Sequence, residues 1–419
     1  MKKHVKRDRI SELPEEIKEQ ILSSLCMKDA ICTSSLSSVW RHTWVSRPSL
    51  DFGFYVYDQF TSYFKTLPTS HPKKRHLYCS IFHKAAVEEE EVDDTVDDFD
   101  IDYWSSGSGS GSDSDKEWEI SKVGYLQMLE EFMQVYIEKN QSLRVLKKMS
   151  LYVPKFCNSK MRDYGVDIVS RCLSLVKHNV TELHYQNYTY GWPHRPKESY
   201  RVLQNCFPIL ESKTLTKLEL SGCYLDMEKT VDVAIHLPNL KHLRLLRFNV
   251  RGNMLETLFA KCPALETLNF SLCKGFKVLR IPRLSKLKEV KVMDIYDLHL
   301  VEINAMSLQC LTLINFNTSK CKLKMASNSC NNLVNLFVDY CGITDDFFNN
   351  VAEFPHLETV SLKHCPELKH IKITGNSLTS LDIEECPNLS QAEVVTPKPF
   401  FTGYSSSSKN IIKRLFPKS

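Results

Sequence analysis

LTKLELSGC (residues 215–223) is the first of five stretches with one pattern that decides the fold of this chain. The others are LETLNFSLC (265–273), LVNLFVDYC (333–341), LETVSLKHC (357–365) and LTSLDIEEC (378–386). Looser copies begin at Leu240, Leu287 and Leu308, and the eight starts lie 25, 25, 22, 21, 25, 24 and 21 residues apart. Self-similarity at such a period indicates one structural unit repeated along the chain.

The pattern itself predicts what that unit looks like. Alternation of apolar and polar residues at its centre makes a short strand, and the other half of each repeat returns as a helix or an irregular turn. Stacked units bury the leucines of their neighbours in one continuous core. A leucine signature at a period of about 20 to 29 residues is typical of leucine-rich repeats, so we predict an α/β solenoid with a leucine-rich-repeat horseshoe.

Five cysteines share the last position of the pattern: Cys223, Cys273, Cys341, Cys365 and Cys386. In a solenoid, equivalent positions stack, and a thiol there behaves as a small buried hydrophobe with a weak S–H donor. A metal site would need closely spaced Cys or His pairs, and no two of the 15 cysteines form C-x-x-C. The pattern therefore predicts a structural ladder, with no metal and no cofactor.

The polar positions between the repeat leucines are expected to line the concave face, where solenoids bind partners. Apolar side chains amid charges on that face are typical of a protein-binding surface. The alternative, that single members are covered by loops or merely tolerated, stays open for each. The predicted substrate-binding residues are Arg244, Leu246, Lys291, Met293, Ile314, Phe337 and Asp339.

Composition and charge exclude several classes of protein. The 419 residues are 42% apolar and 25% charged, which is ordinary for a folded chain. The net charge is +4, but basic residues are spread along the sequence and form no stripe that would follow phosphates, so we expect no nucleic-acid partner. No apolar leader or membrane span is found, and we expect reduced thiols, no membrane and a location in nucleus and/or cytoplasm.

Residues 8–50 read DRISELPEEIKEQILSSLCMKDAICTSSLSSVWRHTWVSRPSL, a compact helical segment. Pro14 suits the start of a helix, and Ile17, Ile21, Leu22 and Leu25 form one apolar face of it. A second helix is expected after Asp29, with Val39, Trp40 and Trp44 on its surface. The segment is too short to bury a core alone, so its apolar surface predicts a docking function.

The remaining chain divides by composition. Residues 88–118 combine an acidic run, with ten acids between Glu88 and Asp102, and a Gly/Ser run, which predicts a disordered insert. An amphipathic helix is expected over 124–137. We therefore expect a docking domain at 1–52, a connecting segment at 53–87, the insert at 88–118, the repeat array at 119–391 and a tail at 392–419.

The opening segment resembles the F-box. The match comprises Asp8–Ser11, Leu13-Pro14, Ile17, Ile21-Leu22, Leu25, Lys28–Ala30, Leu36-Ser37, Trp40, Trp44 and Leu50–Phe52. Joined to repeats that end in Cys, this all-helical N-terminal domain makes the chain similar to the plant F-box/leucine-rich-repeat family. Cys26-Met27 and Ser38-Val39 depart from the usual F-box residues between the helices and before Trp40.

The resemblance implies a non-catalytic substrate-recognition subunit of an SCF-type E3 ubiquitin ligase. In that family the F-box binds a Skp-family adaptor, the adaptor joins a cullin–RING core, and the repeats hold the target protein. Carried over to this sequence, the implied adaptor-binding residues are Leu13, Pro14, Ile17, Ile21, Leu22, Leu25, Val39, Trp40 and Trp44, although some of these must pack the F-box helices on each other. The alternative is a leucine-rich-repeat interaction scaffold with no ubiquitin-ligase role, in which residues 8–50 cap the solenoid.

Overall fold

The computed structural model divides the chain into two compact units. Unit 1 comprises residues 1–180 and 186–195, and unit 2 comprises residues 181–185 and 196–419. The structure describes the following residues: 10, 12–25, 29, 47–66, 113–139, 146–154, 159–187, 207–226, 235–251, 254–316, 321–326, 329, 331–349, 354–397, 401–404 and 412–415.

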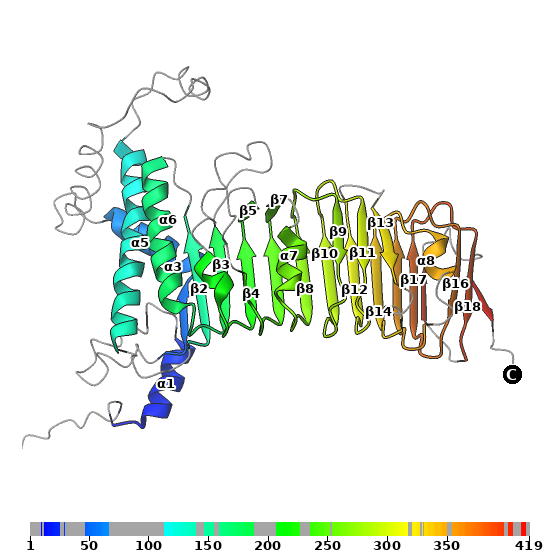
Figure 1. Ribbon diagram of the computed structural model, residues 1–419, viewed down its shortest axis with the longest axis horizontal. Helices are drawn as coiled ribbons and strands as arrows, with labels where there is room; N and C mark the ends of the chain where they lie inside the picture. Colours follow the sequence, from blue (N-terminus) through cyan, green and yellow to red (C-terminus); the bar gives the residue numbers. More distant parts are fainter. Residues whose placement is uncertain are drawn as a thin grey trace, which may run out of the picture. The chain divides into compact units, whose positions relative to one another are not determined.

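The repeats of unit 2 build the predicted solenoid, and each of the eight copies supplies one strand of a parallel main sheet (Figure 1). The leucine-rich-repeat prediction is therefore confirmed. In sheet order the strands from these copies are β4 (Lys217–Ser221), β6 (His242–Leu246), β8 (Thr267–Ser271), β10 (Glu289–Met293), β12 (Cys310–Ile314), β14 (Asn335–Asp339), β15 (Thr359–Lys363) and β17 (Ser380–Glu384).

Period-two alternation decides which side of each strand is buried. The strands pair in register, so Leu243 lies beside Leu218 and Leu268, and the same position continues across the sheet. These side chains are almost fully buried, and each contributes roughly 1.5–3 kcal/mol of apolar burial. The intervening side chains face the other way, and we call that side the open face of the main sheet.

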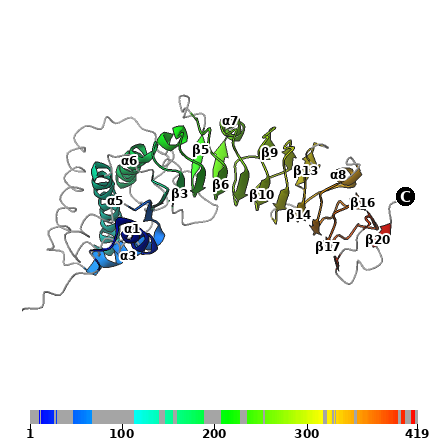
Figure 2. The ribbon, with the colours of Figure 1, turned by 90° about the horizontal axis from the view of Figure 1, so that it is seen from below.

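The second half of the repeats differs from the expectation of helices or irregular turns. Most of it forms strands in three small parallel sheets. They consist of β5 (Tyr224–Asp226) and β7 (Asn249–Arg251), of β9 (Val278–Ile281), β11 (Leu300–Ile303) and β13 (Lys322–Met325), and of β16 (His370–Thr374), β18 (Gln391–Val395) and β20 (Ile412–Leu415). Repeats of only 21 or 22 residues leave little chain for a helix. Two short helices, α7 (Met254–Ala260) and α8 (Asp345–Asn349), occur in longer repeats and lie on the same side of the main sheet as β9 and β13 (Figure 2).

Seven of the eight strands from the repeat copies end in a repeated turn. The residue after the strand adopts a left-handed conformation at Arg247, Leu272, Asp294, Tyr340, His364 and Glu385, and at Gly222. Its N–H donates to a carbonyl of the next strand, as from Tyr340 to Lys363 at 3.1 Å. A left-handed non-glycine residue costs about 1 kcal/mol or more, and this repeated hydrogen bond offsets that cost.

The cysteines that follow these turns are confirmed as a structural ladder. The Cys273 thiol is fully buried and donates to the carbonyls of Leu245 and Ser271 at 3.3 and 3.4 Å. Burial raises the pKa of this thiol to about 12, so the reactive thiolate is disfavoured. Among the described residues, no group of three or more His, Cys, Asp or Glu side chains is placed to hold a metal ion.

The array continues past its predicted end at residue 391. β18 pairs with β16 and β20, while β19 (Phe401–Tyr404) pairs with β17 in the main sheet. Residues 392–419, expected to be a tail, therefore contain strands of both sheets. The leucine signature does not extend here, but Ala392 and Val394 keep the period-two burial of a strand.

Unit 1 combines four described helices with two paired strands. They are α1 (Glu15–Ser24), β1 (Ser49–Phe52), α3 (Phe54–Thr66), α5 (Asp113–Lys139), β2 (Lys148–Val153) and α6 (Ser159–Val176). β1 pairs with β2 in parallel, and α5 packs against α3 and α6. The expected helix over 124–137 is confirmed as part of α5. In the described part of the chain, no helix has the length and apolar character needed to cross a membrane.

Several expected boundaries differ in unit 1. The expected connecting segment at 53–87 contains α3, because Tyr57 and Thr61 are buried on one side of a regular helix. α5 begins at Asp113, inside the range expected to be disordered and before the expected array start at 119. The acidic run at 88–102 and the Gly/Ser run lie outside the described residues.

Candidate functional site

The first candidate surface is the outer side of α1. Its first turn carries Glu15 and Glu16, which favour the positive end of the helix, and Pro14 occupies the N-cap. Ile17 and Ile21 lie four residues apart on one side and are 40% and 37% exposed. Ile10, just before the helix, is 55% exposed, so the surface presents three large apolar side chains to solvent.

The adjacent side of α1 faces inward. Leu22 is fully buried, and Lys18 is 3% exposed with its ammonium group 3.0 Å from the Glu15 carboxylate. The Arg47 guanidinium donates to the Leu25 carbonyl at 2.8 Å and so closes the C-terminal end of the helix. The Arg47 carbonyl accepts from the Tyr136 hydroxyl of α5 at 3.1 Å, which fixes α1 to the core of unit 1.

The predicted adaptor-binding residues differ in their exposure to solvent. Pro14, Ile17 and Ile21 are exposed and Leu13 and Leu25 are half-buried, so these five present surface. Leu22 presents none, because α1 packs it inward. Val39, Trp40 and Trp44, with the second predicted helix, lie outside the described residues. The role of the exposed members in adaptor binding stays a prediction.

The second candidate surface is the open face of the main sheet. The register aligns its side chains in three rows, one of which begins at Lys217, and all seven predicted substrate-binding residues lie in the other two, which we call row one and row two. Row one is Glu219, Arg244, Asn269, Lys291, Thr312, Phe337, Ser361 and Asp382. Row two is Ser221, Leu246, Ser271, Met293, Ile314, Asp339, Lys363 and Glu384. Their role in binding a target stays a prediction.

The N-terminal end of the open face is held by a charge cluster around Glu219. The Lys217 ammonium lies 2.9 Å from this carboxylate, and Arg244 and His184 lie 3.9 Å away. Burial acts to raise the pKa of Glu219, but the hydrogen bond from Lys217 and the nearby positive charges outweigh burial and lower this pKa. Glu219 is therefore ionised at neutral pH, and the residues around it carry an excess of positive charge.

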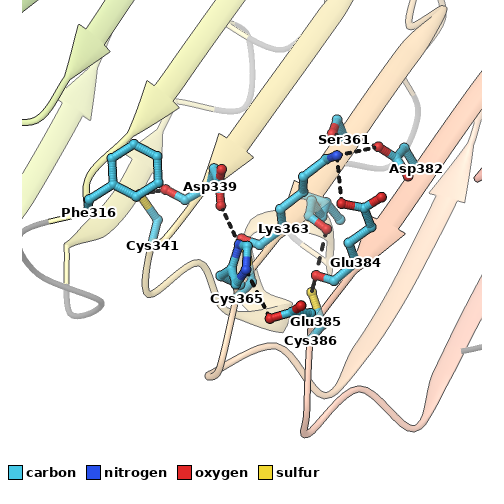
Figure 3. A network of polar contacts seen from close by, with 12 residues as sticks. Phe316, Asp339, Cys341, Ser361, Lys363, Cys365, Asp382, Glu384, Glu385 and Cys386 are labelled. Atoms are coloured by element: carbon cyan, nitrogen blue, oxygen red, sulfur yellow. Dashed lines mark hydrogen bonds and ion pairs between the residues drawn. The ribbon is translucent and has the colours of Figure 1, made fainter. Parts of the chain in front are cut away.

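The C-terminal end has the opposite charge (Figure 3). The Lys363 ammonium lies between the Glu384 and Asp382 carboxylates at 2.7 and 3.1 Å. Hydrogen bonds to Glu384 and then to Asp382 raise the pKa of Lys363 above its ordinary value. His364 lies between the carboxylates of Asp339 and Glu385, with ring nitrogens 2.8 and 3.0 Å from them. The carboxylates outnumber the cations here.

Sequence reasoning missed a third set of side chains on this side of unit 2. The left-handed turn residues Tyr340, His364 and Glu385 follow row two, and their side chains interact with one another and with Phe316. A signal exists in the sequence, because each occupies the position immediately before a repeat cysteine. That position carries no leucine and follows the end of the strand, outside its alternation of apolar and polar residues. The repeat pattern therefore does not indicate it.

The geometry defines a parallel-strand leucine-rich-repeat solenoid preceded by a helical segment with an exposed apolar side. Comparison with protein-family models gives the same division. Residues 10–52 match the F-box domain, and residues 137–338 match the leucine-rich-repeat domain described as At1g61320/AtMIF1, LRR domain.

Individual relatives match in the N-terminal segment. The F-box/FBD/LRR-repeat protein At5g22700 of Arabidopsis thaliana is 48% identical over 56 residues, which is 13% of this chain and 13% of the relative. The F-box/LRR-repeat protein At3g26922 of the same plant is 50% identical over 50 residues, 12% of this chain and 16% of the relative. The matches thus span less than a fifth of either relative. The chain therefore carries an F-box domain and a leucine-rich-repeat domain, the two domains named in these relatives.

Proposed function

We propose that this chain is a substrate-recognition subunit of an SCF-type E3 ubiquitin ligase. The outer side of α1 binds a Skp-family adaptor, through which the chain joins a cullin–RING core, and the open face of the main sheet binds a target protein. The subunit performs no bond chemistry itself. It raises the effective concentration of the target beside the ubiquitin-charged enzyme, in the nucleus or the cytoplasm.

One observation carries the proposal: Ile17 and Ile21 are exposed on the helix that the F-box match covers. Exposed apolar side chains at i and i+4 on a helix anchored from behind are suited to packing against a partner. Because each isoleucine is about 40% exposed, covering its remaining surface would contribute roughly 0.6–1.2 kcal/mol, the same fraction of the value for full burial. F-box domains generally bind Skp-family adaptors, which supplies the kind of partner.

The test is co-purification of the full chain with a purified Skp-family adaptor. We expect the wild type to retain the adaptor and the double variant Ile17→Asp/Ile21→Asp to lose at least about 30-fold in affinity, since two contacts become buried charges. Leu175→Asp is the matched control, because Leu175 is 40% exposed on α6, and it should bind normally. A wild-type chain that does not bind the adaptor overturns the proposal.

The alternative, an interaction scaffold without a ligase role, has one supporting observation. The segment that ends the F-box match is built into unit 1, since β1 pairs with β2 and Arg47 joins α1 to α5 through Tyr136. A scaffold would therefore lose stability when residues 1–50 are deleted and would bind no adaptor. Binding of the adaptor by the intact chain decides against this alternative.

A further inference from the structure

Two aromatic side chains stand out on unit 2. Phe316 and Phe337 are 59% and 38% exposed, and among the described residues of unit 2 they are the large hydrophobic side chains with such exposure. Phe337 lies in row one on β14, and Phe316 follows the neighbouring strand β12. Both therefore lie on the C-terminal half of the unit, and each is an exposed apolar side chain that the hydrophobic effect favours covering.

Phe316 is exposed because its repeat departs from the others. It occupies the last position of the pattern, and the equivalent side chain is buried in the seven other copies, as in Cys341 and Cys365. Asn315 precedes it, is fully buried, and does not take the left-handed conformation found at most equivalent positions. The Phe316 N–H donates to the Asp294 carboxylate at 3.2 Å, and its ring faces solvent.

The exposed ring continues into a row of stacked rings. The centroids of Phe316 and Tyr340 are 4.8 Å apart, and Tyr340 stacks on His364 at 3.9 Å with an angle of 13° between the ring planes. The carboxylates of Asp339 and Glu385 hold the two nitrogens of His364. The stack is therefore fixed at its far end and offers a preformed aromatic platform.

Negative charge surrounds this platform. The acidic–aromatic ridge, as we name it, consists of Phe316, Phe337, Tyr340 and His364 with the carboxylates of Asp294, Asp339, Asp382, Glu384 and Glu385, and the ammonium of Lys363. Figure 3 shows its members Phe316, Asp339, Lys363, Asp382, Glu384 and Glu385. Over the strands from β10 to β17 these five carboxylates exceed the two ammonium groups of the open face, Lys291 of β10 and Lys363, and Lys363 already pairs with two of the carboxylates. The ridge spans five neighbouring strands from β10 to β17, a width of about 19 Å that suits an extended segment of about six residues.

We propose that the acidic–aromatic ridge binds a basic, arginine-containing segment of the target protein. An arginine guanidinium is planar, stacks on aromatic faces such as Phe316, and pairs with carboxylates through two hydrogen bonds. Phosphate-bearing partners are repelled by the same carboxylates. This inference names the chemistry of the target in the proposed function and rests on that role.

The experiment uses the full chain and three labelled peptides of equal length, in which leucine alternates with arginine, with citrulline or with glutamate. Fluorescence anisotropy gives the affinities at low and at physiological salt. We expect the arginine peptide to bind, with an affinity that falls as salt rises, and the uncharged citrulline peptide to bind about tenfold more weakly. The glutamate peptide should not bind.

Matched variants connect this binding to the ridge. Phe316→Ala/Phe337→Ala removes the exposed rings and should weaken the arginine peptide about tenfold, whereas Leu175→Ala removes an equally exposed side chain elsewhere and should change nothing. Glu385→Gln should weaken binding several-fold. Glu256→Gln, a substitution on the other side of the main sheet, is its control.

The inference is overturned if the arginine peptide does not bind, if citrulline or glutamate binds equally well, or if the double phenylalanine variant keeps full affinity. Adaptor co-purification of the same variants separates this result from the proposed function. If the proposed function is wrong, the wild-type chain will not retain the adaptor. If only the inference about the ridge is wrong, the wild type and the variants will still bind the adaptor.

Discussion

Asp345 shows how a single side chain joins two repeats. Its carboxylate, at the start of α8, accepts hydrogen bonds from the backbone N–H groups of Lys369 and His370 at 2.8 and 2.9 Å. Burial acts to raise the pKa of Asp345, but these two N–H groups and the His370 side chain outweigh burial and lower this pKa. Its stabilising contribution is therefore present above the ordinary aspartate pKa and is lost as pH falls through the lowered value.

We predict that Asp345→Ala lowers the free energy of unfolding by about 1–3 kcal/mol at a pH of about 7. The difference from the wild type should disappear well below the ordinary aspartate pKa of about 3.9, because the carboxylate is then neutral in both states. Urea unfolding at several pH values measures both effects. Asp346→Ala, which removes the exposed neighbouring acid, is the control, and a loss independent of pH would contradict the assignment.

At the scale of elements, α5 and β1 are joined inside unit 1 by Tyr125. Its hydroxyl donates to the Phe52 carbonyl at 2.6 Å, and its ring packs edge-on against Tyr57 of α3 at 5.2 Å. Burial, reinforced by the charge of Asp51, raises the pKa of Tyr125 well above its ordinary value, so the hydroxyl remains a donor throughout the working pH range. The strand that ends the F-box match is thus fixed to the longest helix.

We predict that Tyr125→Phe lowers the free energy of unfolding of unit 1 by about 1–2 kcal/mol, because the buried Phe52 carbonyl loses its donor. Thermal and urea unfolding followed by near-ultraviolet circular dichroism measure the loss. Tyr55→Phe removes an exposed hydroxyl on α3 and should stay within about 0.5 kcal/mol of the wild type. Equal stability of the two variants would show that the Tyr125 hydrogen bond contributes nothing.

At the scale of the whole molecule, the solenoid depends on contacts between neighbours. Each strand of the main sheet pairs with the strands beside it, and stability is the sum of such nearest-neighbour terms. β19 and β20 complete the two sheets after residue 396 and cover the edges of β17 and β18. They therefore belong to the folded array.

We predict that a chain ending at residue 396 exchanges the backbone amide hydrogens of β17 and β18 faster than the full chain, because their outer edges lose hydrogen-bond partners. Mass spectrometry after hydrogen–deuterium exchange measures the rates. The amides of β4 and β6, at the other end of unit 2, should keep the exchange rates that they have in the full chain. Unchanged rates in β17 and β18 would mean that the last strands do not stabilise the array.

The sequence by itself determined the repeat, its eight strands and the buried cysteine ladder, because burial on one side of a strand leaves a period-two pattern of leucines. The F-box was indicated by the resemblance of residues 8–52 to that family. The sequence also predicted that the seven substrate-binding candidates lie on the open face of the main sheet, since the alternation along a strand decides which side of the sheet a residue faces. It could not show that the second half of most repeats is a strand or that strands continue past residue 391, because short segments carry too few residues for a clear period.

Only the tertiary structure decided which predicted surface is exposed. Ile17, Ile21 and Leu22 share one apolar face in the sequence, but in the folded chain Leu22 is buried and the two isoleucines remain exposed. Phe316 occupies a position whose side chain is buried in the other repeats. Here the preceding residue, Asn315, is buried instead, and the Phe316 side chain is exposed. Periodicity records which side chains are apolar, whereas exposure depends on neighbours that are distant in the sequence.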